Sequence, residues 1–64
     1  MKNMTPDESI KLNKVLKEEY SVAIGDDFTR FTWEHVKVQI ARYLTERGFD
    51  GRFEVGHIEE KLGL

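Results

Sequence analysis

TWEHVKVQIARYLTERG, at residues 32–48, contains the strongest helical pattern in the chain. Thr32 is a residue type that caps helix N-termini, and Gly48 is a type that ends helices. At roughly 100° of turn per residue, five large apolar side chains fall on one stripe. They are Trp33, Val36, Ile40, Tyr43 and Leu44. The pattern predicts a helix over 33–47 with this stripe in the core.

The first part of the chain has a second helical pattern. Thr5-Pro6-Asp7-Glu8 combines a capping hydroxyl, a proline at the first helical position and two carboxylates near the positive end of the helix dipole. An apolar stripe follows, formed by Leu12, Val15, Leu16, Tyr20 and Ala23. The pattern predicts a helix that begins at residue 6 and ends between residues 20 and 24. Its end stays open because Tyr20, Val22 and Ile24 also alternate like a short strand, whereas Gly25 suits a C-terminal cap.

The two remaining segments are rich in turn-forming residues. Residues 25–32 hold Phe28 and Phe31, and we expect a loop whose aromatic rings fold back onto the core. A hairpin that pairs 20–24 with 28–32 is the alternative. After Gly48 we expect a final short helix over 57–62, with a short strand near 52–55 as an alternative for the residues before it. The predicted fold class is mostly α, a small three-helix domain, with an α+β arrangement as the alternative.

Length and composition limit what the chain can be. It has 64 residues, 39% hydrophobic and 34% charged, which indicates one small domain over 1–64. A core of this size rarely supplies more than roughly 3–5 kcal/mol, so a partner or a second copy is expected to add stability. The absence of cysteine fits a reducing, cytoplasmic setting. No apolar run approaches the roughly 18 residues that span a bilayer, so we expect no membrane partner and no secretory signal.

Residue types that carry chemistry are sparse. His35 and His57 lack the spacing of a helical metal site, and Ser9 and Ser21 lie outside any Gly-x-Ser-x-Gly turn. The glycines follow no phosphate-binding spacing. A net charge of −2 without a strongly basic segment disfavours nucleic acid as a partner. We therefore expect no enzymatic activity, no metal and no cofactor.

Residues 40–44 (IARYL), followed later by residues 57–64 (HIEEKLGL), resemble the lead-in to many helix-turn-helix domains. The resemblance implies DNA binding, and it supplies the alternative function: a nucleic-acid-binding protein with an atypical helix-turn-helix-like C-terminal half. Two features depart from that family. The gap from 48 to 56 is longer than the usual turn, and Glu59 and Glu60 stand where a groove-reading helix carries Arg, Lys, Asn or Gln.

Residues 16–27 (LKEEYSVAIGDD), with 32–36 (TWEHV) and Ile40, resemble the part of acyl carrier proteins that runs from the second helix through its loop to the last helix. The Asp-Ser-Leu that precedes this part in the family, and accepts the phosphopantetheine arm, has no counterpart here. The resemblance therefore implies a helical local fold and no carrier activity.

The outward face of the 33–47 helix holds two apolar residues away from the core stripe. Val38 and Ala41 lie there, flanked by His35, Arg42 and Thr45. A small apolar centre with a polar rim is the usual anatomy of a protein interface. The sequence predicts a small non-enzymatic regulator or adaptor that binds another protein, or a second copy of itself, through these five residues.

Two further expectations concern packing. The two apolar stripes should face each other, with the loop folded onto them, and bury Leu12, Leu16, Tyr20, Phe31, Trp33, Val36, Ile40 and Leu44. Glu19 and Arg47 lie inside these stripes, and a charge near a core is tolerated when it is paired. We expect these two residues to meet at the edge between the helices.

Overall fold

The computed structural model describes residues 2–64, and its first helix, α1, spans Pro6–Tyr20. Thr5 and Glu8 form a capping box: the Thr5 hydroxyl accepts from the Glu8 backbone N–H at 3.2 Å, and the Glu8 carboxylate accepts from the Thr5 backbone N–H at 2.8 Å. Ser21 ends the helix in the left-handed conformation, at φ 56°. The helix therefore begins as predicted and ends at the earlier limit, with Ser21 rather than Gly25 as its cap.

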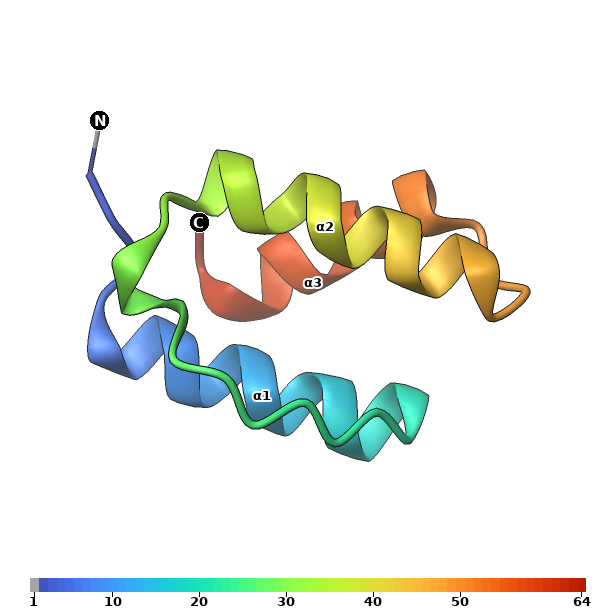
Figure 1. Cartoon of the computed structure of the whole chain (residues 1–64), viewed down its shortest axis with the longest axis horizontal. Helices are drawn as coiled ribbons and strands as arrows, with labels where there is room; N and C mark the ends of the chain where they lie inside the picture. Colours follow the sequence, from blue (N-terminus) through green and yellow to red (C-terminus); the bar gives the residue numbers. More distant parts are fainter. Residues whose placement is uncertain (1) are drawn as a thin grey trace.

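Residues 21–27 form an extended strap that runs back along α1 (Figure 1). Two side chains of α1 hold this strap in place. Asn13 Nδ2 donates to the Asp26 carbonyl at 2.8 Å, and the buried Ser9 hydroxyl accepts from the Phe28 backbone N–H at 3.1 Å. The strap is thus anchored at its far end by polar groups of the helix that precedes it.

The strap explains the alternation seen in the sequence. Val22 is buried and Ala23 is exposed, as in a strand, but a helix lies beside the strap instead of a second strand. The hairpin alternative is wrong. In the part of the chain that the structure describes, β pairing is confined to an isolated bridge between Asn3 and Thr32.

A single turn of 3-10 helix, η1 (Phe28–Arg30), leads into α2 (Trp33–Glu46). Thr32 caps α2 as predicted, accepting from the His35 backbone N–H at 3.3 Å. The helix ends one residue earlier than expected, and Gly48 turns the chain at φ 94°. Figure 1 shows α1 and α2 pointing in the same direction, because the strap returns the chain to the start of α1 before α2 begins.

The third helix, α3 (Gly51–Leu62), runs back beside α2 after the short turn at 47–50 (Figure 1). The alternative of a strand near 52–55 is wrong, because these residues form the first half of α3, and the predicted helix over 57–62 is its second half. Asp50 caps α3 by accepting from the Phe53 backbone N–H at 3.4 Å. Gly51 allows the close approach of α2, since a Cβ there would lie 2.8 Å from the Ala41 carbonyl carbon.

The core lies between the three helices and the strap, and α3 packs against both α1 and α2. The buried apolar side chains are Met4, Leu12, Leu16, Val22, Phe28, Trp33, Val36, Ile40, Leu44, Val55, Ile58 and Leu62. The mostly α, three-helix prediction is confirmed. Two residues that were predicted to be buried in the core are not. Tyr20 is only half-buried, and Phe31 is 44% exposed because Phe28, on η1, occupies the core position instead.

Candidate functional site

Four of the five predicted binding residues are exposed on α2. His35, Val38, Arg42 and Thr45 all face solvent, and Val38 is 54% exposed. Ala41 lies apart from them. It is half-buried, packs against the core and places its carbonyl beside the first residue of α3, so it does not share the exposed face predicted for it.

Phe31 extends this exposed face beyond the start of α2. Its ring stacks on the His35 imidazole, with centroids 5.0 Å apart and 16° between the ring planes. His35 and Val38 are three residues apart, so they are neighbours on the helix. We call Phe31, His35, Val38, Arg42 and Thr45 the α2 outer surface.

The stacked pair borders an open hollow of about 610 Å³. Phe28 and Val36 provide apolar wall, and Asp26, Asp27 and Arg30 provide charge at the edge. The hollow was not predicted from the sequence, because Phe31 was expected to lie in the core. The available signal was the position of Phe31 directly before the cap Thr32, where an apolar side chain packs over the first turn of a helix.

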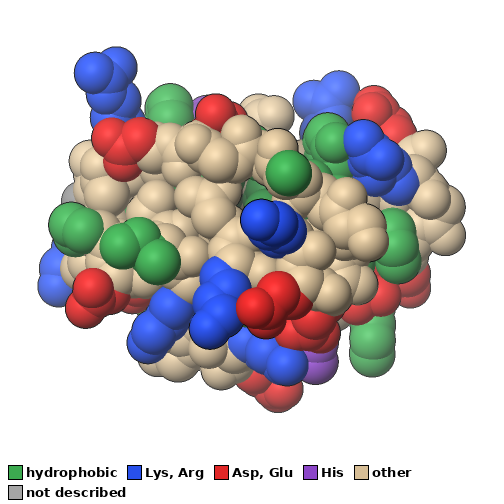
Figure 2. Space-filling model, turned by 90° about the horizontal axis from the view of Figure 1, so that it is seen from below, with side chains coloured by type: hydrophobic (Ala, Val, Ile, Leu, Met, Phe, Trp, Pro, Cys, Tyr) green, Lys and Arg blue, Asp and Glu red, His purple; other side chains and the backbone are tan. Residues whose placement is uncertain are grey.

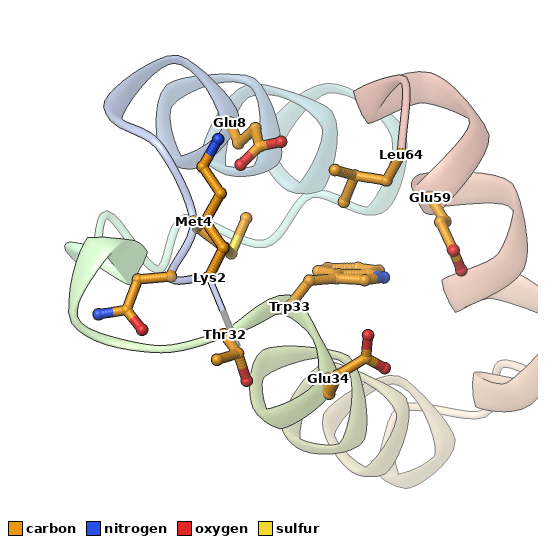
Figure 3. A pocket seen from close by; sticks show the side chains of 9 residues that line it. Lys2, Met4, Glu8, Thr32, Trp33, Glu34, Glu59 and Leu64 are labelled. Carbon is orange, nitrogen blue, oxygen red and sulfur yellow. The ribbon is translucent and has the colours of Figure 1, made fainter.

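A second hollow, of about 430 Å³, lies where the N-terminal segment, the start of α2 and the end of α3 meet (Figure 3). We call it the Trp33 hollow. Its wall includes the Trp33 indole, the carboxylates of Glu8, Glu34 and Glu59, and the Lys2 ammonium group. Trp33 is 8% exposed, and its buried indole Nε1–H has no hydrogen-bond acceptor. Buried hydrogen-bond donors rarely lack an acceptor, so the unpaired indole N–H is an unusual feature of this hollow.

The charged contacts between α1 and α3 differ from the expected pair. Glu19 accepts from Lys61 at 2.8 Å and lies 3.1 Å from His57 Nε2, both on α3. The hydrogen bonds from Lys61 and from His57 lower the pKa of the Glu19 carboxyl. Arg47 instead lies over the Tyr43 ring, 4.6 Å from its centroid, so the predicted pair of Glu19 with Arg47 is wrong.

A further contact ties α1 to α3 near the same end. The Tyr20 hydroxyl donates to the Glu54 carboxylate at 2.8 Å, and the Tyr20 ring meets the edge of Phe49 with centroids 5.2 Å apart. Burial, followed by the hydrogen bond to Glu54, raises the pKa of Tyr20. The phenol is therefore a fixed donor at neutral pH, and its role is structural.

Charge is mixed over the face that Figure 2 displays. Lys and Arg side chains lie next to Asp and Glu side chains there, with hydrophobic side chains scattered between them. A surface that binds the nucleic-acid backbone needs a local excess of positive charge. On this face the Lys and Arg side chains that lie close together in the lower middle of the view have Asp and Glu side chains beside them.

Residues 2–64 contain no cluster of three or more His, Cys, Asp or Glu side chains placed to hold a metal ion. No helix within the same range has the length and apolar character needed to cross a membrane. Comparison of the chain with protein-family models, with curated proteins and with solved structures found no match.

Proposed function

We propose that the protein is a small non-enzymatic regulator or adaptor that binds a partner protein through the α2 outer surface. The observation that carries the proposal is the pairing of two exposed apolar side chains on one face, Phe31 just before the cap of α2 and Val38 on α2 itself. Phe31 stacks on His35, so its ring is already held in place before any partner arrives. Little side-chain entropy would be lost on binding, which favours affinity.

The residue types support a protein as the partner. Aromatic side chains and arginine are enriched at the energetic centres of protein interfaces, and the α2 outer surface offers Phe31, His35 and Arg42. The neighbouring hollow of about 610 Å³ gives a partner side chain a place to insert beside Phe31. The lack of cysteine supports placing this function in the cytoplasm.

The test compares changes of exposed apolar side chains to polar or charged ones. Val38→Glu and Phe31→Ser should leave the helical circular dichroism signal intact and abolish capture of a partner from the native cell. Ile10→Glu is the control, because Ile10 is 67% exposed on α1, outside the proposed surface. Val36→Glu is the control for loss of folding. Val36 is buried, so this change should unfold the chain.

The readouts are mass spectrometry of the captured proteins and sedimentation of the purified variants. A protein retained by the parent and Ile10→Glu, but lost from Val38→Glu and Phe31→Ser, would support the proposal. Self-association with the same pattern would identify a second copy as the partner. Equal retention by all the folded variants would refute the α2 outer surface as the binding site.

One observation favours nucleic-acid binding as a second candidate function. The turn between α2 and α3 spans only 47–50, so the long gap that argued against a helix-turn-helix is absent. The exposed side of α3 carries Arg52 and Phe53, but also Glu60. Titration of a labelled DNA duplex at two salt concentrations tests it, since binding to phosphates must weaken steeply as salt rises.

A further inference from the structure

We infer that the Trp33 hollow binds an arginine of a partner polypeptide, with the guanidinium group at the carboxylates and a neighbouring backbone carbonyl at the Trp33 indole N–H. The site is separate from the α2 outer surface and does not depend on it. The inference rests on the conjunction of an unpartnered buried donor and an excess of negative charge in one hollow.

The excess negative charge of the hollow favours a cationic ligand. Three carboxylates face one ammonium group across about 430 Å³, a volume within the usual range of ligand sites. Two of the carboxylates are already engaged: Glu8 accepts from the Thr5 backbone N–H, and Glu34 lies 3.6 Å from Lys37. Within the described range, Glu59 makes no side-chain hydrogen bond or ion pair, and it is half-buried.

The Trp33 indole indicates that the ligand also carries an oxygen acceptor. Figure 3 shows the nitrogen end of the ring directed toward the space between Glu34 and Glu59. The nitrogen is buried in the free protein, so the side chains that cover it must move aside when an acceptor binds. An indole nitrogen only donates, so it needs an oxygen acceptor, and a guanidinium or ammonium group has none. A polypeptide provides both groups close together: a backbone carbonyl for the indole and a cationic side chain for the carboxylates.

Arginine fits the carboxylates better than lysine does. The planar guanidinium group presents several N–H donors in a fixed fork and can bridge Glu34 and Glu59 at once, whereas an ammonium group acts as a point charge. Glu34, Trp33 and Glu59 come from two helices, so binding would also connect the start of α2 to the end of α3.

The protein carries its own probe, because Trp33 is its one tryptophan. The indole N–H gives a single, isolated proton–nitrogen NMR signal, and the proton moves downfield when it gains an oxygen acceptor. Titration with the blocked peptide acetyl-Gly-Arg-Gly-amide should move this signal downfield in a saturable way. The neutral peptide acetyl-Gly-Gln-Gly-amide should bind about tenfold more weakly or not at all, since it lacks the charge-assisted contacts.

Single substitutions test whether the arginine peptide binds in the Trp33 hollow. Glu59→Gln and Glu34→Gln should each weaken binding of the arginine peptide, whereas Glu18→Gln, an exposed carboxylate on α1, should not. Val38→Glu should bind the peptide like the parent, which separates this inference from the proposed function. No downfield movement at saturating arginine peptide, or equal binding of the glutamine peptide, would overturn the inference. An equal response to agmatine, which has the guanidinium group but no carbonyl, would overturn the part assigned to the indole.

Discussion

Replacing Gly51 with alanine tests the crossing of α2 and α3 at its closest point. Gly51 is buried, and a Cβ built there would lie 2.8 Å from the Ala41 carbonyl carbon and closer still to the Ala41 oxygen and the Thr45 hydroxyl. The Thr45 side chain can rotate away. The Ala41 carbonyl is part of the α2 backbone, so the two helices must move apart.

The expected magnitude follows from two opposed effects. Alanine is better than glycine within a helix by about 1 kcal/mol, which would stabilise the variant. Overpacking a close contact costs about 1–3 kcal/mol, and here the obstacle is backbone. A backbone obstacle places this cost in the upper part of its range, about 2–3 kcal/mol, so Gly51→Ala should lower the free energy of unfolding by about 1–2 kcal/mol. For a domain of this size, each 1 kcal/mol lowers the melting temperature by roughly 4–8 °C.

Gly56→Ala is the matched control on the same helix. A Cβ at Gly56 meets no atom within 4 Å, so only the helix-propensity effect remains. This variant should gain up to about 1 kcal/mol. Urea and thermal denaturation, followed by circular dichroism at 222 nm, measure both, and the two variants should shift in opposite directions. Gly51→Ala melting at or above the parent temperature would refute the close crossing.

Three further predictions concern the core, the strap and the acid limit of stability. Ile40→Ala should cost about 2–5 kcal/mol in urea denaturation, since Ile40 is buried, and a parent-like midpoint would contradict its place in the core. Ser9→Ala leaves the buried Phe28 N–H without its acceptor and should cost about 1–3 kcal/mol; an unchanged midpoint would show that the strap is not anchored there. The Lys61 and His57 hydrogen bonds lower the folded-state pKa of Glu19, so their stabilising effect is present at neutral pH and is lost as the pH falls through that lowered value. Parent and Glu19→Gln should therefore converge in stability on acidification, and a gap that stays constant with pH would rule this out.

Local signals in the sequence were sufficient for α1 and α2. Both helices have a threonine cap and an apolar stripe, and Thr5 and Thr32 mark their starts correctly. These signals act within one or two turns, so they need no knowledge of the rest of the fold. The buried side chains Leu12, Leu16, Ile40 and others of both stripes were predicted for the same reason.

Errors arose where a residue's role depends on a distant neighbour. Gly51 was interpreted as a turn residue, but it is the first residue of α3, and its lack of a side chain lets the Ala41 backbone approach it closely. The alternation of Val22 and Ile24 suited the extended chain that follows Ser21, yet nothing local reveals that α1, and not a strand, lies beside it. The helical pattern correctly predicted that Val38 and His35 are exposed, but it placed Phe31 in the core. It gave no sign of the Trp33 hollow, which forms only where the N-terminal segment, α2 and α3 meet.

The packing of α1 against α3 has a consequence for the order in which the chain acquires structure during synthesis. α1 is made first, but its main helical neighbour is made last. An isolated helix of about 15 residues is marginal in water, so α1 depends on its neighbours for stability. The strap and η1 contact α1 soon after it is made, but the part of its apolar stripe that faces α3 can be shielded only after residues 51–62 have left the ribosome. Release of α3, rather than completion of α1 or α2, therefore sets the moment at which folding can proceed.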